Sequence, residues 1–162
     1  MVRGQARDRA LSIPSCLAAL TAAAALVAAT AAHGSEAVAP CALDALRLAV
    51  ETQGESTTAR IGISLRSSAA RSCRLSAPVT VTILHAGRWA PVRGNPLRRL
   101  VSGVLARGFE KEVLAADWQN WCAGQSGVRL VVSYGTLMNV QPLPVLPACL
   151  DRHRPSSLAL IR

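Results

Sequence analysis

The chain has 162 residues, about the size of one domain. The hydrophobic class makes up 51% and charged residues 17%, which excludes a disordered charged tail and a high-charge coiled coil. Because aromatic residues are only 3%, any core must be aliphatic. The net charge is +9, yet 17 of the 18 cations are arginine. This bias fits a GC-rich coding sequence and is weak evidence for nucleic-acid binding.

The first 32 residues have the pattern of a secretory signal peptide. A start with three arginines precedes an uncharged apolar run over residues 13–32, which ends near Ala29-Thr30-Ala31, an A-x-A cleavage pattern. The alternative is an uncleaved anchor, since about 20 apolar residues can span a bilayer. The weakly apolar alanines and the small-residue exit favour cleavage. We therefore expect a signal peptide at 1–32, a flexible linker at 33–40, and a secreted or cell-surface domain at 41–162 with no membrane span.

Four cysteines remain after the predicted cleavage: Cys41, Cys73, Cys122 and Cys149. An even number in an exported chain predicts two disulfides. Their separations of 32, 49 and 27 residues differ from the C-x₂₋₄-C spacing of structural zinc sites, so zinc is not expected. Four cysteines allow three pairings, and spacing alone does not choose among them.

The predicted domain contains short runs in which apolar and polar residues alternate. Period-two alternation buries one face of a strand, and the runs are separated by turn signals such as Gln53-Gly54 and Ala86-Gly87. The runs are 46–50, 60–66, 79–83, 113–115, 130–134 and a final run at 157–161. This spacing predicts an all-β sandwich rather than a parallel α/β sheet. Residues 97–107 form either a short helix or a strand with its loop, and the prolines of 142–149 make that segment extended and irregular.

Three short motifs occur in a fixed order within this domain. They are Cys73-Arg74-Leu75-Ser76-Ala77-Pro78, Trp118-Gln119-Asn120-Trp121-Cys122 and Pro147-Ala148-Cys149. In this order, residues 41–162 resemble an actinobacterial secreted family called domain of unknown function 4232. The resemblance implies an immunoglobulin-like antiparallel sandwich with disulfides Cys41–Cys73 and Cys122–Cys149, exported or surface-attached. It implies no activity, and the arginine-rich stretch 98–107 departs from the family pattern.

The sequence lacks the motifs of common catalytic sites. It has no Gly-x-Ser-x-Gly, and no phosphate-binding glycine loop with a lysine. The acidic residues fall at turns or on polar strand faces, which argues against a glycosidase pair. Trp118 and Trp121 are three apart, so on one strand they would face opposite sides and form no flat sugar platform. We expect both in the core, and we expect no catalysis and no cofactor.

The histidines support one alternative function. If cleavage follows Ala32, His33 becomes the amino terminus, and its amine and ring nitrogen could bind copper with His85 or His153. The chain would then be a small extracellular copper-binding β-sandwich. If cleavage follows Ala31, His33 lies in a frayed tail and no metal site is expected.

The segment between Gly87 and Gly108 is basic and contains no acid. Its five arginines are Arg88, Arg93, Arg98, Arg99 and Arg107. Guanidinium groups bind phosphate and carboxylate bidentately, so these residues are a candidate anion-binding patch at one loop end of the sandwich. An exported chain would meet anionic cell-envelope polymers rather than nucleic acid. The alternative is a solvated, solubilising face. The leading hypothesis is an exported, non-catalytic binding or structural module of the cell envelope.

Overall fold

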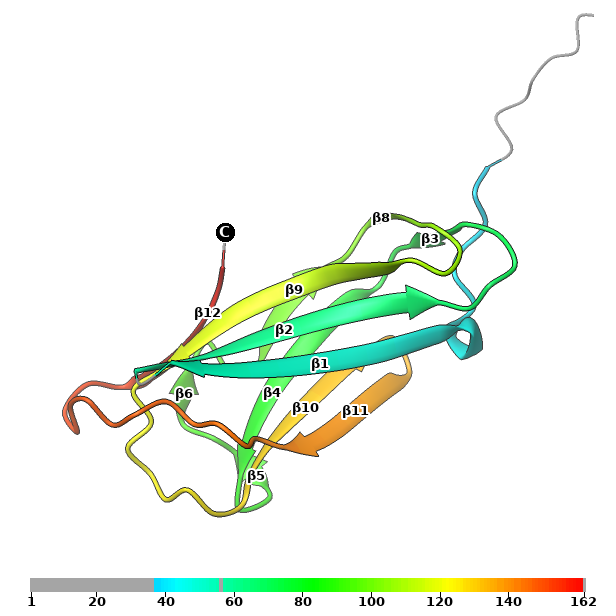
Figure 1. Ribbon diagram of the computed structural model, residues 1–162. Coiled ribbons are helices and arrows are strands. Elements are labelled where there is room, and N and C mark those ends of the chain that lie inside the picture. Colours follow the sequence, from blue (N-terminus) through cyan, green and yellow to red (C-terminus); the bar gives the residue numbers. More distant parts are fainter. Residues whose placement is uncertain (1–36, 56, 162) are drawn as a thin grey trace, which may run out of the picture. The chain divides into compact units, whose positions relative to one another are not determined.

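The computed structural model describes residues 37–55 and 57–161 and shows two β-sheets with a short two-stranded ribbon (Figure 1). The first sheet has the order β1 (Leu46–Glu55), β2 (Thr58–Ser67), β9 (Glu110–Gln119), β12 (Ser156–Leu160) and β6 (Val92–Arg93). The second has the order β11 (Leu137–Pro142), β10 (Val128–Tyr134), β4 (Pro78–His85) and β5 (Arg88–Trp89), with β7 (Leu97–Leu100) also paired to β4. The ribbon joins β3 (Cys73–Leu75) to β8 (Gly103–Leu105), and a 3-10 turn, η1 (Leu43–Ala45), precedes β1.

The order of the strands is that of an immunoglobulin-like sandwich. The neighbours β1-β2-β9 and β11-β10-β4 correspond to A-B-E and G-F-C, and β12 lies beside β9 where strand D would lie. All strand pairs of the two sheets are antiparallel except β12 with β6. The all-β sandwich that the alternating runs predicted is therefore confirmed.

The core lies between the two sheets and is mostly aliphatic, but three aromatic side chains, Trp118, Trp121 and Tyr134, are buried in it as well. Alternate residues of β2 are fully buried, among them Ile61, Ile63 and Leu65, while the residues between them are half-buried or exposed. β4 and β10 repeat the pattern with Val81 and Leu130. Pleating sends successive side chains to opposite faces, so each alternating run supplies one layer of the core.

Residues 97–107 contain β7 and β8, so of the two alternatives for this segment the strand with its loop is confirmed and the short helix is wrong. β7 follows Asn95, whose side chain makes hydrogen bonds to the edge of β4 that a neighbouring strand would otherwise make. Its Oδ1 accepts from the Ile83 amide at 2.9 Å, and its Nδ2 donates to the carbonyls of Ile83 and Ala90 at 2.9 and 3.0 Å. One side chain thus satisfies the backbone of β4 between its partners β5 and β7.

Two disulfides join the predicted pairs. Cys41–Cys73 links the chain before η1 to the ribbon, and Cys122–Cys149 links the segments that follow β9 and precede β12. The pairing implied by the family resemblance is confirmed. Backbone hydrogen bonds from Arg74 to Ala39 and from Cys41 to Arg74 fasten the chain to β3 just ahead of the expected boundary at residue 41. Among the described residues, no helix has the length and hydropathy needed to cross a membrane.

Candidate binding surface

The second sheet has an outer face that the described part of the chain leaves exposed. The register puts Met138 beside Ser133, Val140 beside Val131, Trp89 beside Leu84 and Leu100 beside Pro78, all on the side opposite the core. Trp89, Leu100 and Met138 are 68%, 70% and 68% exposed. Thr80, Thr82 and Ser133 lie among them. We call this surface the open face; it is a mixture of apolar and hydroxyl side chains.

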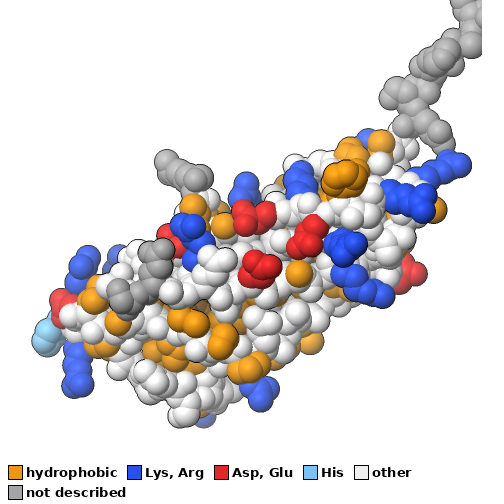
Figure 2. Space-filling model, in the orientation of Figure 1, with side chains coloured by type: hydrophobic (Ala, Val, Ile, Leu, Met, Phe, Trp, Pro, Cys, Tyr) orange, Lys and Arg blue, Asp and Glu red, His pale blue; other side chains and the backbone are white. Residues whose placement is uncertain are grey.

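No carboxylate belongs to the open face. The strands β4, β5, β7, β10 and β11 contain no Asp or Glu, whereas β1 and β9 contain Glu51, Glu110, Glu112 and Asp117. Figure 2 shows the outer face of the first sheet, where acidic side chains gather over the middle and basic side chains lie both beside them and toward the two ends. The open face instead contains Arg98, opposite Thr80, and Arg129, opposite Leu84. The two sheets therefore present surfaces of different charge.

The five predicted arginines do not form one patch. Arg88 lies opposite His85 and Arg98 opposite Thr80, so they are roughly 16 Å apart along β4 at 3.3 Å per residue. Arg99 sits next to Arg98 on the edge strand β7. Arg93 is on β6 in the first sheet, opposite Ser157, and Arg107 lies in the turn after β8. All five are exposed, and none has a carboxylate within 4 Å among the described residues.

A second group of arginines lies at one end of the first sheet. Arg47, Arg66 and Arg107 line a hollow of about 350 Å³ together with Ser67, Ser68 and Gly108; we call it the arginine hollow. Arg47 on β1 stands directly opposite Arg66 on β2, and both point away from the core. Arg47 Nη1 also donates to the carbonyls of Asp44 and Leu46, both at 3.3 Å. The sequence argument included Arg107 but missed Arg47, Arg66 and Arg129, whose positions depend on strand pairing.

Trp118 and Trp121 belong to the core, as predicted, but for a different geometric reason. They are 0% and 4% exposed, and their ring centroids are 5.2 Å apart. The expectation that they face opposite sides of a strand is wrong. β9 ends at Gln119, and Asn120 has a φ of 56°, which breaks the alternation and returns Trp121 to the core. Trp118 Nε1 donates to Ser156 Oγ at 2.8 Å, so its polar atom is satisfied inside the core.

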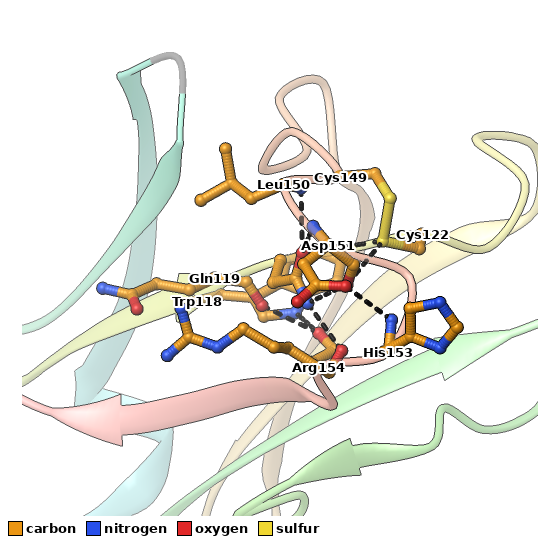
Figure 3. Close-up of a disulfide and its surroundings, with 10 residues drawn as sticks. Trp118, Gln119, Cys122, Cys149, Leu150, Asp151, His153 and Arg154 are labelled. Atoms are coloured by element: carbon orange, nitrogen blue, oxygen red, sulfur yellow. Dashed lines mark hydrogen bonds between the residues drawn. A yellow bond between two sulfur atoms is a disulfide. The ribbon is translucent and has the colours of Figure 1, made fainter.

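Asn120 also orders the loop beside the surface disulfide, which Figure 3 shows. Its Nδ2 donates to the carbonyls of Asp151 and Arg154 at 2.9 and 2.6 Å. Its Oδ1 accepts from the amides of Leu150 and Asp151 at 2.9 and 3.0 Å. The segment after Cys149 therefore has a fixed backbone, although Cys149 and its neighbours are exposed.

The histidines of the copper hypothesis are not gathered into a described site. His33 lies outside the described residues. His85 is half-buried, and its ring packs edge-on against Trp121 with centroids 5.3 Å apart. His153 is exposed in the turn after Asp151, to which its amide donates. Within residues 37–55 and 57–161, no three His, Cys, Asp or Glu side chains are placed to hold a metal ion.

A second hollow, of about 330 Å³, lies on the first sheet and is lined by Gln53, Gly54, Thr58, Arg60 and Asp117. Arg60 Nε and Asp117 Oδ1 are 3.5 Å apart, and the two side chains are 59% and 32% exposed. Asp117 supplies the one carboxylate among these five lining residues, and that carboxylate is held in the solvated ion pair with Arg60. The hollow has the chemistry of a polar surface rather than of a nucleophile with its general base.

No family model matches the chain, and comparisons with curated proteins and with solved structures find no significant match. The resemblance to domain of unknown function 4232 therefore stays a prediction from the ordered motifs.

Proposed function

We propose that the chain is an exported, non-catalytic binding module that adsorbs to anionic polymers of the cell envelope. The observation that carries the proposal is the open face, where exposed arginine and apolar side chains lie together without a carboxylate. Export is supported by the two disulfides, which are typical of proteins that fold in an oxidising compartment. It is also supported by the signal-peptide pattern of residues 1–32, which lie outside the described residues.

The chemistry of the open face favours a polymer over a lipid bilayer. Its centre carries the hydroxyl groups of Thr80, Thr82 and Ser133, so it has no continuous apolar surface to insert among lipid tails. The exposed Trp89 suits the rings of a sugar polymer, since aromatic side chains combine a large apolar area with a polar edge. Arg98 and Arg129 supply planar donors for phosphate or carboxylate groups on such a polymer.

The test is co-sedimentation with purified cell walls at about 0.1 M and about 1 M salt, between which the Debye length falls from about 10 to about 3 Å. The variant R98Q/R129Q removes both cations of the open face. The control R152Q/R154Q removes the same net charge from the exposed turn after Asp151. We expect wild type and control to pellet with walls at low salt only, and R98Q/R129Q to remain in the supernatant.

Equal losses in both double variants would show that net charge alone causes adsorption and would contradict a binding face. If neither salt nor either double variant changes the binding to walls, the protein recognises them through a surface other than the open face. A parallel arm uses phosphatidylglycerol vesicles. If wild type floats with the vesicles and fails to pellet with walls, the surface recognises lipid and the polymer proposal is wrong.

A further inference from the structure

We infer that the arginine hollow is a discrete binding site for a phosphate group. It lies on the first sheet and shares no residue with the open face, so the inference goes beyond adsorption by that face and does not depend on it. Three arginines, Arg47, Arg66 and Arg107, line one hollow of about 350 Å³. They come from two strands and a turn, so folding assembles the group from distant parts of the chain.

The arrangement costs stability unless an anion is present. Arg47 and Arg66 are direct cross-strand partners on the same outward face. Like charges placed directly opposite each other destabilise a sheet. In the described residues, no carboxylate lies within 4 Å of Arg47, Arg66 or Arg107. Glu110 stands opposite Arg66 on β9 and forms no ion pair with it. The hollow therefore concentrates three positive charges, and the one described acid opposite them, Glu110, pairs with none of the three within 4 Å.

The backbone holds the three arginines close together. The Gly108 amide donates to the Ser67 carbonyl at 3.0 Å, and the Ser67 amide donates to the Phe109 carbonyl at 3.4 Å. These bonds fix the turn that carries Arg107 against the end of β2. The amide and hydroxyl of Ser68 both donate to the Ala45 carbonyl, at 2.8 and 3.0 Å, and fix the end of β2 to the start of β1. A site built on fixed backbone loses less entropy when it binds an anion.

Phosphate fits this group better than carboxylate does. A phosphate monoester carries a charge of about −1.5 to −2 at neutral pH, with oxygens pointing in several directions. Such an anion can accept bonds from the guanidinium forks of Arg66 and Arg107 and from the Arg47 nitrogens other than Nη1, which is bonded to backbone carbonyls, whereas a carboxylate presents two oxygens in one plane. Glu110 would repel the bound anion, so its removal should strengthen binding.

The experiment is a residue-resolved NMR titration of the disulfide-bonded domain at constant ionic strength. The probes are inorganic phosphate, glycerol 1-phosphate, and acetate as the planar comparison. We expect saturable shifts at the amides of Ser67, Ser68 and Gly108 with both phosphates, and weaker shifts with acetate. R66Q/R107Q should abolish saturation, E110Q should tighten it several-fold, and the control R98Q/R129Q, altered only on the open face, should bind phosphate as wild type does.

A separate readout excludes loss of folding as the cause. Without phosphate, R66Q should unfold at a urea midpoint close to that of wild type, because it removes both the repulsion from Arg47 and the attraction to Glu110, its two cross-strand partners. Linear shifts of equal size in wild type and R66Q/R107Q would overturn the site, as would saturable shifts confined to the open face. Phosphatidic acid vesicles and a soluble sugar phosphate, both of which carry a phosphate monoester, separate a lipid source of the group from a soluble one. The source is the probe whose binding R66Q/R107Q abolishes. If the double variant abolishes the binding of neither probe, the proposed site is contradicted. Wall adsorption lost in R98Q/R129Q with phosphate shifts intact would separate the open face from this site.

Discussion

Asn120 holds both backbone groups of Asp151: its Nδ2 donates to the Asp151 carbonyl at 2.9 Å and its Oδ1 accepts from the Asp151 amide at 3.0 Å. The amide side chain thus makes the two hydrogen bonds that a neighbouring strand would make to the loop between Cys149 and β12. Figure 3 shows this loop beside the disulfide Cys122–Cys149. Asparagine suits the position because it tolerates the left-handed φ of 56° and carries both a donor and an acceptor.

Asn120→Ala should therefore destabilise the domain by roughly 2–4 kcal/mol, because it leaves several backbone groups without partners and puts a Cβ residue at a positive φ. Asn120→Gly also removes the side-chain amide, but glycine adopts the positive φ without strain. The stability that this variant loses therefore reports on the missing hydrogen bonds without the backbone strain of alanine. Urea denaturation provides the values. The control Asn139→Ala, on half-buried β11 with no side-chain hydrogen bond in the described part of the chain, should change stability by less than about 0.5 kcal/mol. Equal losses at 120 and 139 would contradict the role of Asn120.

The two disulfides should differ in their response to a reductant. Cys122 and Cys149 are exposed, whereas Cys73 is only 5% exposed and Cys41 is half-buried. Thiol–disulfide exchange requires access to a sulfur, so dithiothreitol without denaturant should open Cys122–Cys149 first. Timed alkylation and peptide mapping would follow the order. Earlier alkylation of Cys41 and Cys73 would show that the ribbon opens more readily than its burial indicates.

Either disulfide should contribute about 3–4 kcal/mol in the chain-entropy model, because their sequence separations of 32 and 27 residues are similar. Cys73→Ser should cost more than this loop term alone, since it also leaves a polar group in a buried site.

Asn95 should be as important for the second sheet as Asn120 is for the loop. Asn95→Ala removes three bonds to the backbone of Ile83 and Ala90, and we expect a loss of about 2–3 kcal/mol. Asn95→Asp keeps the acceptor for the Ile83 amide but turns an oxygen toward two carbonyls, so it should be at least as harmful. Hydrogen exchange at the Ile83 amide gives a local measurement. An unchanged exchange rate in Asn95→Ala would show that this bond is not formed in solution.

Processing can be tested directly on protein from the culture medium. The charged start, the apolar run and Ala29-Thr30-Ala31 predict a mature chain that begins near Ala32 or His33. Intact-mass analysis locates the terminus, and a terminal His33 would make the copper hypothesis testable. Full-length chain recovered from washed membranes would instead indicate an uncleaved anchor.

Local alternation predicted most of the fold, since period-two burial is a property of each strand by itself. The runs at 46–50, 60–66, 79–83, 113–115, 130–134 and 157–161 became β1, β2, β4, β9, β10 and β12. The strand β11 was missed because it lies at a sheet edge, where Met138 and Val140 are exposed and the pattern has no clear apolar side.

The sites were harder to predict, because pairing brings together residues that are far apart in sequence. Gly54 was read as a turn, but it lies inside β1, where its hydrogen allows Val145 to approach; a Cβ would overlap the Val145 side chain. The turn follows Glu55, and that shift in register is what puts Arg47 opposite Arg66. A correct hairpin turn would have revealed that pair, whereas Arg98 and Arg129 share a face only through β4.

Trp89 is the tryptophan that should report on ligand binding. It is 68% exposed on the open face, while Trp118 and Trp121 are buried. Trp89→Ala should change stability by less than about 0.5 kcal/mol, as is usual for surface residues, whereas Trp118→Ala should cost about 3–5 kcal/mol. Iodide should quench only part of the fluorescence, and Trp89→Phe should remove that part. If the open face binds a wall polymer, saturating polymer should protect the same fraction from iodide, and R98Q/R129Q should abolish the protection. If the polymer does not change the iodide quenching although the protein still binds walls, the binding surface lies away from Trp89.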